Sequence, residues 1–141
     1  MRAAAILHDI GYAPNIVSTG FHSLDGALYL RRRGFPNRLC ALVAHHSCAY
    51  KESELRGLSK ELEPWSDERT VVRDALWWAD MTTRPDGEPT NVDGRIAEIV
   101  KRYGPTDIVS CFIQQAKWEL VAAVERTEER LRAAGLGHLA K

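Results

Sequence analysis

The chain has 141 residues, of which 45% are hydrophobic and 27% are charged. Its 19 basic and 19 acidic side chains cancel, so the net charge is zero when the histidines are neutral. This balance excludes the basic excess that is typical of proteins binding nucleic acid polymers or membrane surfaces. No apolar run approaches the ~20 residues of a membrane span. Three cysteines without a Cys-x-x-Cys pair favour a reducing, cytoplasmic location.

Every periodic segment of the chain has helical spacing, and no alternating run is long enough for a strand, so we predict an all-α fold. Pro36 is placed to open a helix, Gly87 lies in a turn that ends one, and Thr90-x-x-Asp93 has the pattern of a capping box. Helices are expected at about 2–10, 22–33, 36–48, 67–83, 91–103 and 106–134, with a short charged segment at 51–63. We expect one domain over residues 1–141, with a motif-bearing core at 1–84 and C-terminal helices at 90–135.

An adjacent pair, His8 and Asp9, ends the first apolar helix. An imidazole beside a carboxylate offers two lone-pair donors to a divalent metal. Four of the five histidines fall in the first third of the chain, and the candidate set comprises His8, Asp9, His22, His45, His46 and Asp80. This clustering predicts a metal site.

The two adjacent histidines of the third helix are expected to differ in role. Leu39, Leu42, Val43 and His46 stand at i, i+3, i+4 and i+7, which places His46 on the stripe that faces the core. His45 is turned about 100° from that stripe. His46 is therefore the better ligand candidate, and His45 is better placed to meet a substrate or to support a ligand.

His22 begins the second helix, and Gly26 one turn later leaves room for a neighbouring helix or a metal. Asp80 ends an apolar stretch, where a buried carboxylate is costly unless it is paired or bound to a cation. Two simpler interpretations stay open: His22 as a surface histidine, and Asp80 in an ion pair with Arg84.

In this order, the segments resemble the HD-domain superfamily of helical, metal-dependent phosphohydrolases. The resemblance covers roughly residues 1–84 and rests on Ala5-Ile6-Leu7-His8-Asp9-Ile10-Gly11, His22-Ser23-Leu24-Asp25-Gly26-Ala27, Leu42-Val43-Ala44-His45-His46 and Ala79-Asp80. It implies that His8, Asp9 and Asp80 are the core metal ligands, with Asp9 able to bridge two metals. It also implies that His22 and His46 are the additional ligands of two-metal members.

The chain departs from the family pattern at two points. Family members carry another metal-binding histidine on a helix before the His-Asp pair, and only seven residues precede His8. Either the natural protein begins upstream of Met1 and this chain lacks its first helix, or the site is incomplete; we favour the first, because every later ligand position is filled. Tyr12 stands where many phosphohydrolase members have a lysine, which leaves room for a different substrate.

The resemblance implies that one or two divalent ions (Fe, Mn or Mg) activate water for attack on a phosphoester or phosphoanhydride of a small, nucleotide-like molecule. Asp9 and His45 are the predicted catalytic residues, and His45 is the candidate proton donor to the leaving oxygen. Candidates for contact with the substrate are Tyr12, Lys51 and Arg84, whereas the run Arg31-Arg32-Arg33 is expected to be mostly a solvated face.

Three alternatives remain open at this stage. The first is a di-iron HD-type oxygenase, which the tyrosine at position 12 keeps open. The second is a catalytically incomplete module of the same fold that binds a nucleotide or a metal. The third is a purely structural bundle, in which the histidines are incidental. We expect a phosphorylated small molecule as the partner, with no nucleic acid polymer and no membrane, and leave the formation of a homodimer open.

Overall fold

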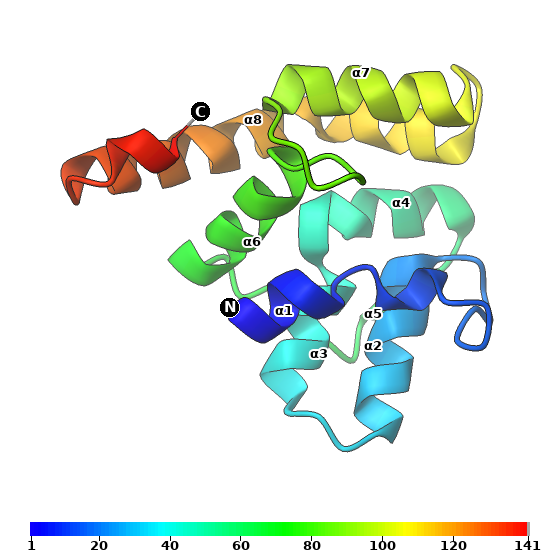
Figure 1. The fold of residues 1–141 in the computed structure, drawn as a ribbon. Coiled ribbons are helices and arrows are strands. Elements are labelled where there is room, and N and C mark those ends of the chain that lie inside the picture. The colour runs from blue at the N-terminus through cyan, green and yellow to red at the C-terminus, as the bar shows by residue number, and fades with distance from the viewer. Residues whose placement is uncertain (141) are drawn as a thin grey trace. The chain divides into compact units, whose positions relative to one another are not determined.

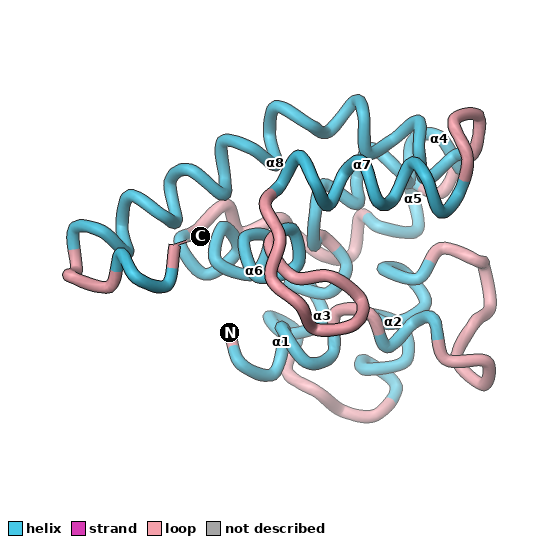
Figure 2. The backbone as a smooth tube through the Cα atoms, turned by 45° about the horizontal axis from the view of Figure 1, so that its top comes forward, coloured by secondary structure: helices cyan, strands magenta, loops and turns pink. Residues whose placement is uncertain are grey.

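The computed structural model describes residues 1–140, and within that range it contains helices and loops with no strand, which confirms the all-α prediction (Figure 2). Thr83 and Pro89 form a single isolated β-bridge. The chain divides into two compact units, one spanning Met1–Arg69 and the other beginning at Thr70. In the described range, no helix has both the length and the hydropathy needed to cross a membrane.

Unit 1 is built from short helices (Figure 1). They are α1 (Arg2–Leu7), η1 (Ile10–Tyr12), α2 (His22–Arg32), α3 (Asn37–Ala44), η2 (His46–Cys48), α4 (Ala49–Arg56) and α5 (Ser59–Leu62). Helices α2 and α3 pack against each other, and α1 packs on α3. Phe21, Leu24, Leu30 and Val43 are fully buried at the centre of this core, which also includes Trp65. Burial of these apolar side chains supplies the main force that holds the short helices together.

The described part of unit 2 contains three helices and a terminal turn. They are α6 (Val71–Met81), α7 (Val92–Tyr103), α8 (Ile108–Ala133) and η3 (Gly137–Leu139). Helix α8 packs against both α6 and α7, and α7 and α8 run side by side in opposite directions (Figure 1). Phe112, Ala116, Leu120 and Val124 are buried along α8, where they recur every four residues and form an apolar stripe.

The predicted third helix is too long at its C-terminal end. Helix α3 stops at Ala44, and Ser47 and Cys48 have left-handed backbone angles, with φ of 45° and 61°. A left-handed conformation costs an L-residue about 1 kcal/mol or more. Because neither residue is glycine or asparagine, the sequence carries none of the usual signals for this break.

Three other boundaries also differ from the prediction. The first helix ends at Leu7 and is followed by the separate turn η1, and α6 begins at Val71 with Thr70 as its N-cap. The cap of α7 is Asn91, whose side chain accepts a hydrogen bond from the backbone N–H of Gly94, so the capping box predicted at Thr90 is wrong. Asparagine is at least as good an N-cap as threonine, which accounts for the shift by one residue.

Candidate metal centre

The ends of short helices present the candidate ligands of unit 1. His8 is the C-cap of α1, and Asp9 is the next residue, just before η1. His22 is the first residue of α2, and His46 begins η2 directly after α3 has ended. Each side chain therefore projects from a point where the backbone changes direction. These positions allow residues far apart in the sequence to face one another.

Two glycines bring η1 close to the start of α2. A Cβ atom added to Gly11 would overlap the backbone carbonyl oxygen of His22. A Cβ atom on Gly26 would lie 3.2 Å from side-chain carbons of both Ile10 and Val43. The absence of both side chains lets η1 rest on the first turn of α2. This packing holds Asp9 near the ring of His22.

The side chains of Asp9, His22 and His46 converge, with one potential ligand atom of each lying within 4.8 Å of the others. Oδ1 of Asp9 is 3.6 Å from Nε2 of His22 and 3.8 Å from Nε2 of His46. The two Nε2 atoms are 3.0 Å apart. Oδ2 of Asp9 is 3.4 Å from Nε2 of His8. The two oxygens of the Asp9 carboxylate thus face different imidazoles, and the rings of His8 and His46 also contact each other edge to face, with centroids 5.1 Å apart.

Backbone carbonyl groups orient two of these imidazoles. Nδ1 of His46 donates a hydrogen bond to the carbonyl oxygen of Val43 at 2.6 Å, and Nδ1 of His8 donates to that of Ala5 at 2.9 Å. In a neutral ring, a proton on Nδ1 leaves the lone pair on Nε2. Both Nε2 atoms are the ones that face Asp9. Support of this kind fixes the tautomer and ring direction that a metal ligand needs.

The geometry of the cluster fits a shared divalent ion. Ligand atoms that bind one ion at roughly 2.1 Å lie about 3.0–3.4 Å from one another in tetrahedral or octahedral arrangements. The separations of 3.0, 3.6 and 3.8 Å among Asp9, His22 and His46 are close to this requirement. Small rotations of the side chains would bring all three donors into range. Two imidazoles and a carboxylate suit Fe or Mn better than Mg, which prefers oxygen ligands.

The cluster is buried on one side and open on the other. The side chain of His46 is 3% exposed and that of His22 is 14% exposed, whereas that of Asp9 is 50% exposed. Solvent and small molecules therefore reach the site from the side of Asp9. Tyr12 lies at the same open side, with its half-exposed ring stacked on that of His22 at a centroid distance of 4.1 Å.

His45 makes a contact that the sequence did not predict. Its Nε2 atom donates a hydrogen bond of 2.7 Å to the carbonyl oxygen of Trp65. This bond ties the end of α3 to the segment that follows α5, so His45 contributes to the structure of unit 1. Its predicted catalytic role stays a prediction.

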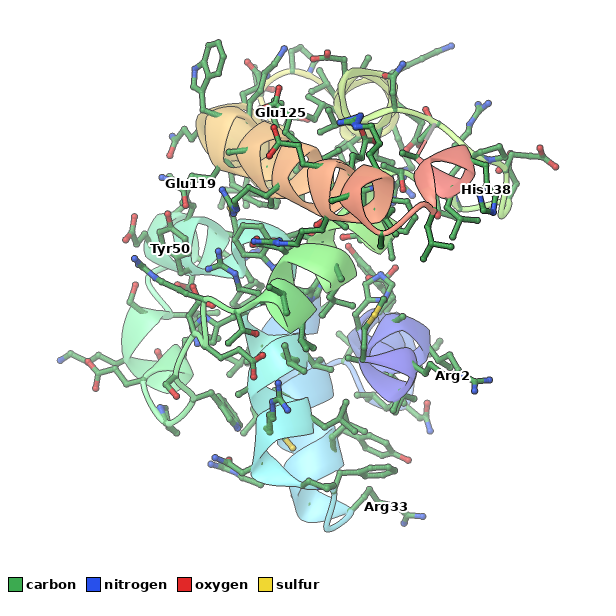
Figure 3. All side chains as sticks on the ribbon, turned by 90° about the vertical axis from the view of Figure 1, so that its left-hand side faces the viewer. Arg2, Arg33, Tyr50, Glu119, Glu125 and His138 are labelled. Carbon is green, nitrogen blue, oxygen red and sulfur yellow. The ribbon has the colours of Figure 1, made fainter. Side chains whose placement is uncertain are left out.

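The other predicted residues lie on different elements. Lys51 is on α4, and its amino group lies 5.2 Å from the centre of the ring of Tyr50, the neighbouring residue, which is labelled in Figure 3. Asp80 and Arg84 belong to unit 2. Oδ1 of Asp80 is 3.7 Å from Nη2 of Arg95, and Arg84 is exposed in a turn. The roles proposed for these three residues stay predictions.

Arg31, Arg32 and Arg33 are exposed at the C-terminal end of α2, as expected for a solvated face. Arg33 extends away from the helix (Figure 3). Arg31 also covers the ring of Trp65, at 4.8 Å from its centre. The three arginines therefore lie on the surface of unit 1, where Arg31 also packs against Trp65.

A small hollow of about 230 Å³ lies in unit 2, beside the loop that follows α6. Its lining residues are Trp78, Thr82, Thr83, Gly87, Pro89 and Leu139. Trp78 and Thr82 are four residues apart and share one face of α6, and Oγ1 of Thr82 donates to the carbonyl oxygen of Trp78. Asp80 is about 200° around the helix from both, so it lies on another face of α6.

Asp25 has a structural role near the site that was not predicted from the sequence. The carboxylate of Asp25 is 1% exposed and accepts hydrogen bonds from the backbone N–H groups of Ser18, Thr19 and Gly20 and from the hydroxyl of Thr19. It therefore fixes the loop that leads into His22. The available signal was a carboxylate on the buried face of a helix, one turn after a Ser-Thr-Gly loop.

The comparisons with known proteins agree with this picture. A family model described as HD domain matches residues 1–103, a range that runs from α1 to the end of α7. That family commonly consists of hydrolases, and its domains bind divalent metals. Comparisons with curated proteins and with solved structures gave no match.

Proposed function

We propose, from the premise that this chain belongs to the HD domain family, that it is a metal-dependent phosphohydrolase acting on a small, nucleotide-like phosphoester or phosphoanhydride. The observation that carries the proposal is the convergence of Asp9, His22 and His46 at a half-open site, with His8 beside Asp9. Clustered titratable groups of this kind are typical of functional sites.

Asp9, His22 and His46 would hold the first ion, and His8, which faces the other oxygen of Asp9, would be a further ligand. Because its two oxygens face different imidazoles, Asp9 is placed to bridge a second ion. We retain Asp80 as a further ligand. When bound, such ions supply Lewis-acid activation of water and neutralise charge on phosphoryl oxygens.

The remaining residues have supporting parts in the proposal. The Asp9 carboxylate, the most exposed of the ligands, faces the side from which substrate arrives and can hold the attacking water in line. We retain His45 as the candidate proton donor to the leaving oxygen. Tyr12 would contact the substrate through its exposed ring, and Lys51 and Arg84 are candidates for contact with phosphate.

The test is hydrolysis by protein loaded anaerobically with Mn(II), Fe(II) or Mg(II), assayed on phosphomonoesters, nucleotides and dinucleotides. We expect stoichiometric metal and release of phosphate, with Asp9→Asn and His46→Gln losing both. The matched control is His138→Gln, because His138 is exposed on η3 in the other unit.

Two results would overturn the proposal in different ways. Stoichiometric iron with consumption of oxygen and no hydrolysis would identify an oxygenase. Absence of metal binding by the intact chain would leave a module that is not an enzyme of this class.

A further inference from the structure

Three arginines surround a buried carboxylate in unit 2. The carboxylate of Asp74, on α6, is 4% exposed. Nε and Nη2 of Arg126 donate to its two oxygens at 2.8 and 2.9 Å, and Nη1 of Arg130 donates to Oδ2 at 3.0 Å. Nη2 of Arg73 lies 3.5 Å from Oδ1. Asp74 therefore fixes the direction of two guanidinium groups that project from α8.

The charges of this group do not cancel. Arg126 and Arg130 are four residues apart on α8, and like charges at this spacing repel each other on a helix. The single negative charge of Asp74 offsets one of the two positive charges. Arg73 adds a further cation beside them, with its guanidinium 4.2 Å from the centre of the Trp77 ring. The positive charge of Arg126 and Arg130 is thus concentrated at one place on α8.

Both arginines retain hydrogen-bond donors that face solvent. A guanidinium has five N–H groups. Arg126 uses two and Arg130 uses one in the hydrogen bonds to Asp74. Their side chains are 43% and 45% exposed. A planar edge with two or more free N–H groups matches the oxygens of a phosphate group, and it binds more strongly when its orientation is already fixed.

Nearby acidic side chains do not occupy these donors. Glu125 and Glu129 are exposed on α8, and in the described part of the chain neither forms an ion pair with Arg126 or Arg130. Figure 3 shows Glu125 on α8. Glu128 lies 3.8 Å from a different arginine, Arg132. The solvent-facing edges of the two arginines are therefore available to an external anion.

We propose that Arg126 and Arg130, oriented by Asp74, form a binding site for the phosphate group of a small phosphate monoester. A phosphate monoester carries a charge of about −1.5 to −2 at neutral pH and presents three acceptor oxygens. It therefore complements both the charge and the donor pattern of the pair. The site depends on α6 and α8 alone and requires no metal, so it stands independently of the proposed hydrolase activity.

The test is calorimetric titration of the full chain in the presence of a chelator, which prevents metal in unit 1 from binding phosphate. Phenyl phosphate and inorganic phosphate are the probes, and acetate is the comparison anion. We expect phosphate to bind in preference to acetate, with an affinity that falls as salt is added. Tighter binding of phenyl phosphate than of inorganic phosphate would assign the site to an ester.

Arg130→Gln is the decisive variant, because Arg130 makes only one hydrogen bond to Asp74 and its loss disturbs the cluster least. We expect it to weaken phosphate binding about tenfold, the effect of losing one charge-assisted hydrogen bond. Arg130→Lys keeps the positive charge without the planar edge, so its affinity for phosphate should lie between those of the wild type and Arg130→Gln. It also replaces Arg130→Gln in the test if that variant does not fold. Arg132→Gln is the matched control on the same helix. Equal phosphate affinity in the wild type and the Arg130 variants, or no binding by the wild type at tens of millimolar, would overturn the proposal.

Discussion

Nε2 of His22 and Nε2 of His46 lie 3.0 Å apart, although the two residues are 24 positions apart in the chain. Because Nδ1 of His46 donates to Val43, Nε2 of neutral His46 carries a lone pair and accepts a hydrogen bond from His22. The contact joins the start of α2 to the start of η2, the short helix that follows α3. A divalent ion would replace the shared proton and hold the same two helices together.

The first prediction is that metal stabilises the folded chain. An ion that binds only the native state at a hundred times its Kd adds about 2.7 kcal/mol to the free energy of unfolding. We expect this gain with Mn(II) in urea denaturation of the wild type and not of His22→Gln. Hydrogen exchange should place the added protection at residues 8–12, 22–26 and 46–48. Equal stabilisation of both proteins would show that the metal binds elsewhere.

A second prediction concerns the two glycines that face each other. Gly11→Ala would force a methyl group into the carbonyl oxygen of His22, and a backbone atom cannot move aside without shifting α2. We expect a loss of about 3 kcal/mol or more, with reduced affinity for metal. Gly26→Ala would meet side-chain carbons of Ile10 and Val43 at 3.2 Å and the backbone nitrogen of Gly11 at 3.3 Å, contacts that shifts of a few tenths of an ångström relieve, so we expect about 1 kcal/mol.

The pair of glycine variants supplies its own control, because both add one methyl group within the same contact. Urea midpoints measured side by side give the order of the two effects. A larger loss for Gly26→Ala would contradict the close approach of η1 to α2.

The sequence predicted the helical class and the side chains that gather in unit 1, because both depend on residue type and spacing. Asp9, His22 and His46 do lie together, while their role as ligands stays a prediction. The end of α3 at Ala44 was not predictable, since Ser47 and Cys48, which follow it with left-handed angles, have no special preference for them. Tertiary packing imposes that conformation, and local sequence does not reveal it.

The roles of Gly11 and Asp25 do not appear in the hydrophobic periodicity of the sequence either. Gly11 acts through the space it leaves for a backbone carbonyl group 11 residues away, and Asp25 acts by accepting backbone N–H groups. Neither contact produces periodicity. Sequence patterns report which side chains face a core, and they carry little information on how backbone segments approach one another.

The third prediction is that Asp25 stabilises the loop before α2. Asp25→Ala would leave the N–H groups of Ser18, Thr19 and Gly20 without their acceptor. We expect a loss of about 3 kcal/mol, because several charge-assisted hydrogen bonds disappear together. Hydrogen exchange at residues 18–20 should become faster in the variant.

Two milder changes calibrate that result. Asp25→Asn keeps one acceptor oxygen and should lose less than the alanine variant. Thr19→Val removes the hydroxyl bond to Asp25 and the bond that this hydroxyl accepts from the backbone N–H of Phe21, and should cost about 1–2 kcal/mol, still less than the alanine variant. If exchange at residues 18–20 in Asp25→Ala matched that of the wild type, the loop would have to be held by other contacts.

The fourth prediction is a loss of stability in acid that involves Asp74. Burial by itself would raise the pKa of this carboxyl group, but hydrogen bonds from Arg126 and Arg130, with the charges of Arg126 and Arg73, lower it from 3.8 to about 2. A lowered pKa in the folded state stabilises the fold at every pH above 3.8. That contribution is lost as the pH falls from 3.8 through about 2, where the folded carboxylate takes up its proton.

The size of the effect follows from the same two values. The difference between these two pKa values corresponds to roughly 2 kcal/mol in the free energy of unfolding. Because the two arginines on α8 are partly exposed, solvent screens their charges, and we expect about 1–2 kcal/mol. We therefore expect Asp74→Asn to be less stable than the wild type by this amount at pH 7, with the gap closing toward pH 2.

The comparison for this pH series is Asp93→Asn. Asp93 also contacts a cation, Lys117 at 2.7 Å, but its side chain is 68% exposed, so the pair contributes on the order of 0.5 kcal/mol or less. Urea unfolding of the wild type and both variants at several pH values from neutral to 2 provides the measurement. A gap between Asp74→Asn and the wild type that stays constant across this range would contradict the prediction. The loss would then come from the shape of the side chain, because a charge effect must vanish once the carboxylate is protonated.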